Sequence, residues 1–467
     1  MSEIMKTLFQ LVVWIFCSVF LAGCGGGNST VTTITGAGLN ALGASPSVSL
    51  PFVQTANNLR VSVESGPAGG FSGTQNANIL YATVTVCAPS DASRCQIIDH
   101  VQIDTGSVGL RIFASKVSSL NLPQVTLDTA GTQAWECYPF VIGGLWGGVA
   151  VADLGLGQQW AKAVPIQLIQ DGPTMQAPQD CAAATNNQIL SSVSALGSNG
   201  ILGIGSVTLD CGQTCLQGNY AAANVPYEQY RGCPHNATDA KQCASATVQQ
   251  NQQVFNPLAA LDVDNNGVVL LMPAVTGLGA ETANGELIFG INTQANNQLA
   301  SGSTTVHLGV DLLNNPDSYL AITTQYNGQT IYNSYLDTGT NGLFFADSVG
   351  NPIAKCLASD WYCPPSLAVQ TAVLSDGDSP QKNQVNVQFG VGNANALFST
   401  TNAAFGDLAG APPVSTVSTA PVKASFSWGM PFFYGKKVFL SIWDPYPKNP
   451  LADPLFSNSP WYSWSPI

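Results

Sequence analysis

A seven-residue motif that occurs twice constrains the fold of this chain more than any other feature. The first copy runs from Asp104 to Leu110 (DTGSVGL) and the second from Asp337 to Leu343 (DTGTNGL). Apolar residues flank both copies, so each Asp is expected at the end of a buried strand, where an unpaired carboxylate is costly. Asp-Thr-Gly is also a good turn sequence, and two unrelated turns are the alternative. Because the flanks are repeated as well, we predict that the two carboxylates meet at one site.

The composition favours an all-β fold. Only 9% of the 467 residues are charged, whereas Gly (46) and Pro (28) are abundant, and long stretches with helical periodicity are missing. At about 100–200 residues per domain, the length allows two or three units. The net charge of −13 argues against a nucleic-acid partner, which requires basic surface.

Two carboxyl groups that lie close together share one proton, because both cannot ionise cheaply. Such a dyad can activate a water molecule as general base and protonate a carbonyl oxygen as general acid, with no cofactor and no metal. In each loop a Thr can bind backbone across the site, a Gly permits close approach, and a hydroxyl can bind the outer carboxylate oxygen. The supporting residues are Thr105, Gly106, Ser107, Thr338, Gly339 and Thr340.

These motifs resemble those of the bilobal, pepsin-like aspartic peptidases, in which each lobe supplies one apolar-Asp-Thr-Gly-[Ser/Thr] loop. In that family an apolar-apolar-Gly segment crosses beneath the loop; Ile201-Leu202-Gly203 matches it closely, and Trp428 to Phe433 more loosely. The resemblance covers most of the chain. It implies an all-β, bilobal pepsin-like acid-protease β-barrel fold with a cleft between pseudo-symmetric lobes, and aspartic endopeptidase activity with Asp104 and Asp337 as catalytic residues. The chain also resembles bacterial lipoproteins of unassigned function that carry the motif twice.

The resemblance further implies a flap, a hairpin that covers the substrate. We expect it at residues 138–150, with Gly143 to Gly147 at its tip and with Tyr138 and Trp146 as the flap candidates. The family usually has a Trp shortly after the first loop. Here that segment is Leu110-Arg111-Ile112-Phe113.

The N-terminus is typical of an exported lipoprotein. Lys6 precedes an apolar run that is too short for an ordinary membrane-spanning helix, and Leu21-Ala22-Gly23-Cys24 resembles a lipobox. This resemblance implies a signal peptide at residues 1–23, fatty acylation at Cys24, and sorting to the outer membrane of a bacterial cell envelope, on its periplasmic face or at the cell surface. A plain signal peptide with a chance Cys is the alternative.

We predict five segments along the chain. The signal peptide is followed by a flexible tether at 24–58, an N-terminal lobe at 59–290 with a Cys-rich loop insertion at 206–250, a C-terminal lobe at 291–445 and an irregular Pro- and Trp-rich tail at 446–467.

Ten cysteines remain beyond Cys24, an even number that indicates disulfides in an exported chain. Zinc is the alternative, but of three His only His235 lies among the Cys. Asp262 to Gly267 matches half of a calcium loop, but the twelfth position is Pro273 rather than Glu, so no metal is expected. Neighbours along the chain give the pairs Cys87 with Cys95, Cys137 with Cys181, Cys211 with Cys215, Cys233 with Cys243, and Cys356 with Cys363.

A fold does not fix a function, so three functions remain open from the sequence. The first is a membrane-anchored aspartic endopeptidase that acts on a peptide or protein substrate. The second is a catalytically silent lipoprotein of the same fold that binds a peptide or cell-envelope partner in the cleft. The third is a surface adhesion or assembly module that uses the Trp-rich tail and the Cys-rich insertion. We expect a monomer without a cofactor.

Overall fold

The computed structural model describes part of the chain. The described residues are 46–70, 76–185, 187–218, 229–310, 320–347, 350, 352–412, 425–444 and 459–467. The predicted signal peptide, Cys24 and the start of the predicted tether lie outside them. The described residues belong to one compact unit, Ala44–Ile467.

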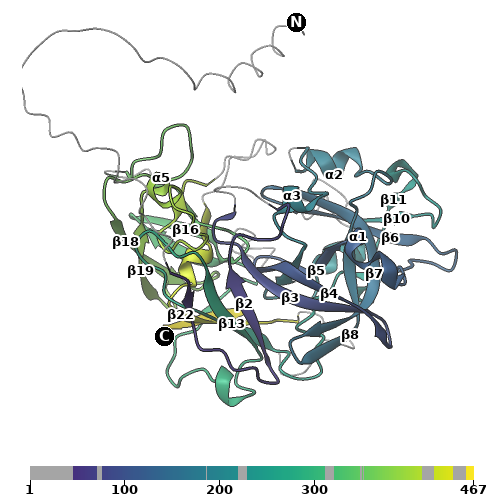
Figure 1. Ribbon diagram of the computed structural model, residues 1–467, viewed down its shortest axis with the longest axis horizontal. Helices are drawn as coiled ribbons and strands as arrows, with labels where there is room; N and C mark the ends of the chain where they lie inside the picture. The colour runs from purple at the N-terminus through teal and green to yellow at the C-terminus, as the bar shows by residue number, and fades with distance from the viewer. Residues whose placement is uncertain are drawn as a thin grey trace, which may run out of the picture. The chain divides into compact units, whose positions relative to one another are not determined.

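The described strands form two sheets, which confirms the predicted all-β fold (Figure 1). One sheet has 16 strands and carries the first Asp-Thr-Gly loop, and the other has seven and carries the second. The two loops therefore come from different lobes. The larger sheet contains β1 (Val48–Ser49), β2 (Asn58–Val63), β3 (Leu80–Ala88), β4 (Asp91–Asp104), β5 (Val108–Phe113), β6 (Gln133–Phe140), β7 (Gly143–Leu156), β8 (Gln159–Ile169), β9 (Gly200–Ile204), β10 (Tyr230–Cys233), β11 (Ala244–Ser245), β12 (Gly267–Met272), β13 (Ala283–Phe289), β14 (Val306–His307), β22 (Lys436–Ser441) and β23 (Trp461–Pro466). The smaller sheet contains β15 (Ile322–Tyr326), β16 (Gln329–Leu336), β17 (Leu343–Phe345), β18 (Ala368–Ser375), β19 (Val385–Val391), β20 (Ala409–Gly410) and β21 (Ser425–Trp428).

The described helices are short, with three to five residues each, as expected from the missing helical periodicity. They are α1 (Ala114–Val117), η2 (Ser118–Leu120), α2 (Gln179–Ala183), α3 (Val193–Leu196), α4 (Gln213–Gln217), η3 (Ala240–Gln242), η4 (Gln250–Gln252), η5 (Ala295–Asn297), α5 (Ala394–Leu397) and η7 (Met430–Phe432).

An aromatic cluster fills the core of the smaller sheet. Phe426 lies between Phe345 and Trp428, with ring centroids 4.9 and 4.2 Å away, and Phe389 meets Phe426 and Trp428 edge-on. Such pairs add to the stabilisation from buried apolar area. The cluster positions the second loop, because the Trp428 carbonyl accepts a hydrogen bond from the Asp337 amide at 3.0 Å.

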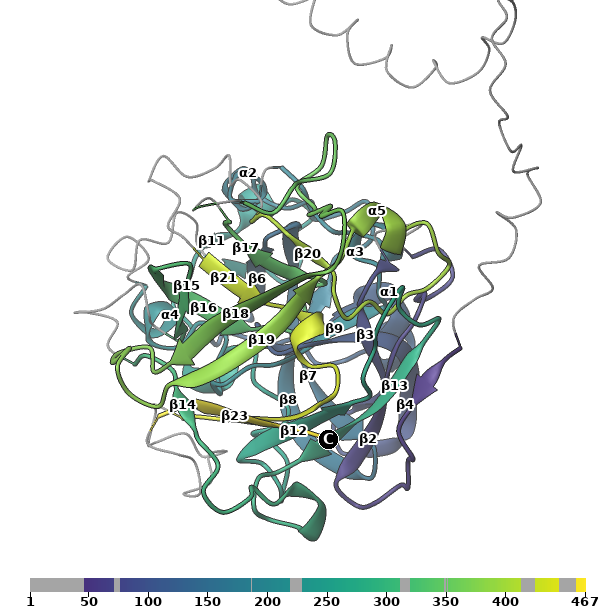
Figure 2. The ribbon, with the colours of Figure 1, turned by 90° about the vertical axis from the view of Figure 1, so that its left-hand side faces the viewer.

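The larger sheet also contains segments predicted to lie elsewhere. Residues 461–466 form β23, which pairs with β22 and lies beside β14 (Figure 2), so this part of the tail is a strand and not irregular. β1 pairs with β13, and Asn58 is buried and donates to the Val53 carbonyl, so the predicted tether already belongs to the folded unit from residue 48 onward. Within the predicted loop insertion at 206–250, β10 pairs with β6 and extends the sheet.

The disulfide prediction is confirmed for all five pairs. Cys137–Cys181 joins β6 to α2, and two pairs lie within the Cys-rich insertion. Four of the five bridges close short loops of 4 to 10 residues, whereas Cys137–Cys181 spans 44 residues. Cys87 and Cys95 lie directly opposite each other on β3 and β4.

Candidate active site

The first loop lies between β4 and β5, with β9 inserted between these strands. β9 runs parallel to β4, with Gly203 opposite Asp104, and antiparallel to β5, with Gly203 opposite Gly109. A Cβ on Gly203 would lie 2.6 Å from the Val108 amide nitrogen, so only glycine permits this crossing. Ile201-Leu202-Gly203 therefore crosses the loop as expected.

The second loop repeats this arrangement. β21 runs parallel to β16, with Trp428 opposite Leu336, and antiparallel to β17, with Trp428 opposite Leu343. A Cβ on Gly429 would lie 2.2 Å from the Gly342 carbonyl oxygen. The segment at Trp428 and Gly429 matched the expected pattern only loosely, yet it crosses between the two strands that flank the second loop.

Thr105 and Thr338 join the two loops. The Thr105 hydroxyl donates to the Leu336 carbonyl at 2.9 Å and accepts from the Thr338 amide at 3.0 Å. The Thr338 hydroxyl donates to the Ile103 carbonyl at 2.8 Å and accepts from the Thr105 amide at 3.1 Å. Both side chains are buried, so four hydrogen bonds fix the loops against each other.

The inner oxygens of both aspartates face one small volume. Asp104 Oδ1 and Asp337 Oδ1 each accept from the amide of the Gly in their own loop, at 2.8 Å. A Cβ on Gly339 would lie 2.5 Å from Asp104 Oδ1 and 3.0 Å from Asp337 Oδ1, and one on Gly106 would lie 2.7 Å from Asp337 Oδ1. Each carboxylate therefore lies against the glycine of the opposite loop.

Hydroxyl groups hold the outer oxygens. Ser107 donates to Asp104 Oδ2 and Thr340 donates to Asp337 Oδ2. All eight residues predicted at the paired loops are therefore brought together.

The electrostatics of the pair favour one shared proton. Burial, then the charge of Asp104 and a hydrogen bond to it, raise the pKa of Asp337 to about 8, although the Thr340 hydroxyl and the Gly339 amide oppose this rise. The pair as a whole is thus expected to hold one proton near neutral pH. Tyr335, two residues before Asp337, was not identified as a site residue from the sequence. Burial and then the charge of Asp337 raise the pKa of its phenol, so the two groups interact electrostatically.

The predicted hairpin exists, but its tip was misplaced. β6 and β7 pair from Phe140 opposite Gly143, which leaves Val141 and Ile142 as the turn, 78% and 58% exposed. Trp146 lies opposite Cys137 near the start of β7, 1% exposed, and its indole donates to the Met175 carbonyl. Trp146 is therefore a core residue and not a residue of the flap tip.

Tyr138 contacts the strand that follows the first loop, β5. Its ring stacks on the Arg111 guanidinium, with 3.7 Å from Arg111 Cζ to the ring centroid. Burial raises the pKa of the Tyr138 phenol; the charge of Arg111 opposes this rise, and the charges of Asp210, Asp104 and Glu136 add to it.

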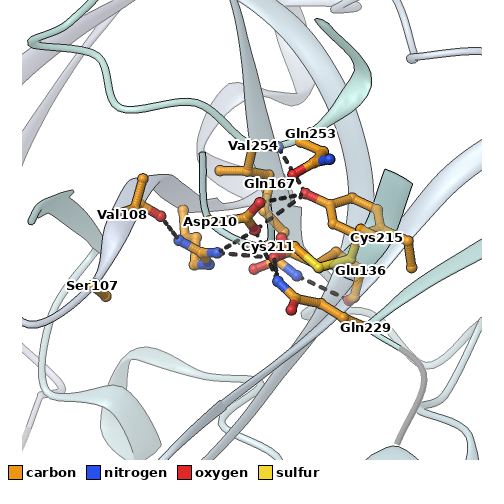
Figure 3. A network of polar contacts seen from close by, with 12 residues as sticks. Ser107, Val108, Glu136, Gln167, Asp210, Cys211, Cys215, Gln229, Gln253 and Val254 are labelled. Carbon is orange, nitrogen blue, oxygen red and sulfur yellow. Dashed lines mark hydrogen bonds and ion pairs between the residues drawn. A yellow bond between two sulfur atoms is a disulfide. The ribbon is translucent and has the colours of Figure 1, made fainter. Parts of the chain in front are cut away.

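A buried charge cluster behind the first loop was missed in the sequence. The side chains of Arg111, Glu136 and Asp210 are fully buried and paired, as Figure 3 shows for the polar groups around Glu136 and Asp210. The available signal was Arg111 itself, a charge in an otherwise apolar strand. Its partners come from β6 and from the Cys-rich insertion, and no local pattern links those segments to it.

Two cavities of about 140 and 210 Å³ lie elsewhere, and neither is lined by Asp104 or Asp337. The candidate site is therefore identified by the carboxylate pair, and the substrate cleft stays a prediction. Among the described residues, no cluster of three or more His, Cys, Asp or Glu is arranged to hold a metal, and no helix is long and apolar enough to cross a membrane.

Comparisons with known proteins extend these findings. No curated protein matches the sequence. A solved structure with a similar chain course is the aspartic proteinase from Irpex lacteus, with a TM-score of 0.41 and 12% identity over 82% of this chain and 93% of that chain. The sequence matches, over residues 53–452, the family described as "Protein of unknown function (DUF3443)". Because this match spans most of its length, the chain belongs to the DUF3443 family.

Proposed function

We propose that this protein is an aspartic endopeptidase that hydrolyses peptide bonds with a water molecule held by Asp104 and Asp337. One observation carries the proposal: the inner oxygens of both carboxyl groups face the same small volume over Gly339. A structural ion pair would place a cation between two such groups, whereas here the groups that hold them are amides and hydroxyls.

The shared proton supplies both steps of hydrolysis. As the water oxygen bonds to the peptide carbon, the ionised carboxylate of the pair takes a proton from the water and the protonated one gives its proton to the carbonyl oxygen. The resulting diol then collapses. The carbon–nitrogen bond breaks, a proton passes to the leaving amine, and the dyad again holds one proton.

The proposal includes a cellular setting. Acylation at Cys24 would anchor a monomer to the outer membrane, on the periplasmic face or at the cell surface, with a peptide or protein as substrate. Several acyl chains give firm anchoring, since a single chain is marginal. Replacement of the acylated thiol, Cys24→Ser, should move the protein from the membrane fraction to the soluble fraction while the folded unit stays intact.

A peptide library tests the chemistry. Protein lacking residues 1–24 should cleave peptides between about pH 3 and 7, where the dyad holds one proton. Asp104→Asn and Asp337→Asn should each abolish cleavage, and a statine-type inhibitor should block it. Full activity in Asp337→Asn would exclude the dyad mechanism. A folded protein that binds peptides without cleaving them would instead support the silent binding protein.

A further inference from the structure

We infer that Arg111 is a positioning residue that clamps the β6–β7 hairpin, and with it Tyr138, against the first aspartate loop. The inference deepens the proposed function and rests on it for its catalytic part, because the hairpin matters for catalysis only if Asp104 and Asp337 act on a substrate. Its structural part stands on contacts that do not depend on activity.

One end of Arg111 binds the aspartate loop. Its Nη1 donates to the carbonyl of Val108, the residue that follows Ser107. Ser107 in turn donates to the outer oxygen of Asp104. The guanidinium is therefore connected to the Asp104 carboxylate through two hydrogen bonds and the backbone between Ser107 and Val108, which is held in place by pairing with β9.

The other contacts of Arg111 hold one face of β6. Nη2 binds Glu136 Oε1 at 2.9 Å, and the guanidinium carbon lies 3.7 Å from the Tyr138 ring centroid. Residues 136 and 138 are two apart on a strand and so share a face. A planar, fully charged guanidinium can bind a carboxylate at its edge and an aromatic ring on its face at once, which lysine cannot. Arg111 thus grips the hairpin at two successive positions.

Asp210 completes the clamp from the Cys-rich insertion. Its Oδ2 lies 3.1 Å from Arg111 Nη2, and it accepts further hydrogen bonds from Gln229 and Tyr230 (Figure 3). Burial, and then the charge of Glu136, raise the pKa of Asp210 well above its usual range. The two carboxyl groups and one guanidinium therefore carry no net charge when Asp210 holds a proton, which is how the protein can bury all three.

The burial of Arg111, Glu136 and Asp210 indicates a role other than stability for this ion cluster. A buried charged group is costly unless it is fully paired, and replacing such clusters by apolar residues is often neutral for stability. The two carboxyl groups instead hold the guanidinium group of Arg111 in one orientation. That orientation places the Tyr138 ring on the guanidinium of Arg111, whose other end binds the Val108 carbonyl in the loop that carries Asp104.

The test compares five full-length proteins in detergent, one of which combines the triple change below with Tyr138→Leu. Arg111→Met/Glu136→Gln/Asp210→Asn removes the clamp without leaving a buried charge unpaired. Tyr138→Leu removes the ring but leaves the ion cluster intact, and Tyr138→Phe keeps the ring as the matched control. The wild-type protein is the reference. Amide hydrogen exchange of residues 133–156 reports on the hairpin, and the β18–β19 hairpin of the other lobe is the internal standard.

We expect exchange in β6–β7 to accelerate about tenfold in the triple variant and in Tyr138→Leu, with no change in Tyr138→Phe and none in β18–β19. The triple change and Tyr138→Leu should each lower kcat/KM about tenfold, mainly through kcat, and their combination should lower it no further. A purely structural role would give additive losses.

Two results would overturn the inference. Hairpin exchange within twofold of wild type in Tyr138→Leu refutes the clamp, even if the triple variant does not fold. Additive losses of kcat/KM show that Arg111 does not act through Tyr138. If wild-type protein cleaves no peptide while the exchange results hold, the clamp stands and the proposed peptidase function fails, so the two outcomes are distinct.

Discussion

Thr105 and Thr338 exchange hydrogen bonds in a reciprocal pattern: each hydroxyl accepts from the amide of the other residue and donates to a carbonyl of the opposite loop. The pattern is the main polar link between the two aspartate loops. It makes the spacing of the carboxyl groups depend on two side-chain hydroxyls.

Removing one of these hydroxyls should weaken the link between the lobes. Thr105→Val keeps the shape but leaves the Leu336 carbonyl and the Thr338 amide unpaired, so it should lower the free energy of unfolding by about 1–3 kcal/mol. Urea unfolding measures this. Thr371→Val, at an exposed site on β18, should stay within about 0.5 kcal/mol of wild type. Equal effects of the two changes would contradict the prediction.

Stability should fall as pH rises from about 4 to about 8. In this window folded Asp337, with its pKa of about 8, binds a proton that the unfolded chain has released. The stabilising contribution is complete below about pH 4 and is lost as pH passes the folded pKa, on the order of 1 kcal/mol per pH unit. Unfolding of Asp337→Asn across the same range should give a flatter profile, and an unchanged slope would sink the assignment.

The alkaline limit of peptidase activity should move when Thr340 loses its hydroxyl. The hydrogen bond from Thr340 opposes the rise in the pKa of Asp337, so its removal in Thr340→Ala should raise that pKa and shift the alkaline limb of kcat/KM to higher pH. Thr340→Ser keeps the hydroxyl and should keep the wild-type limb. A shift to lower pH would mean that Thr340 does not stabilise the ionised form.

Disulfides should contribute according to the loop that each one closes. Cys137 and Cys181 are 44 residues apart, so Cys137→Ala/Cys181→Ala should lower the free energy of unfolding by about 4 kcal/mol. Cys211 and Cys215 are 4 apart, and their removal should cost about 2 kcal/mol. Calorimetry of both variants under non-reducing conditions gives the comparison. The reverse order would contradict the loop-entropy account.

The paired site could be predicted from sequence because both halves carry the same local pattern. Asp104 ends β4 and Asp337 directly follows β16, each after a fully buried apolar residue (Ile103 and Leu336), and burying a carboxylate there twice makes sense only if the two meet. The five disulfides were also accessible, because each bridge joins neighbours along the chain.

The hairpin tip was misplaced because glycine occurs both in turns and in strands that pack closely against a neighbouring strand. Gly143 to Gly147 reads as a turn, yet these residues begin β7. A Cβ on Gly147 would lie 1.9 Å from the Leu168 carbonyl oxygen, so the glycine serves close strand packing. The true turn, Val141 and Ile142, is apolar and reads as strand.

The charge cluster and the last strand were missed for another reason. Asp210 lies in a segment that reads as a disulfide-stapled loop, and its contact with Arg111 spans 99 residues. β23 follows a Pro-rich stretch, and its pairing with β22 depends on the sheet already being formed. Contacts between residues so far apart in the chain produce no local sequence pattern from which they could be predicted.

The crossing strands have a consequence for how the site comes into being. The loop at Asp104 is complete only after residues 200–204 insert between its flanking strands, and the loop at Asp337 only after residues 425–428 do so. In a chain that folds as it emerges N-terminus first from a ribosome or a secretion channel, the loop at Asp104 would therefore be complete long before the loop at Asp337. The site proposed here would therefore be complete only after residues 425–428 have joined the second loop.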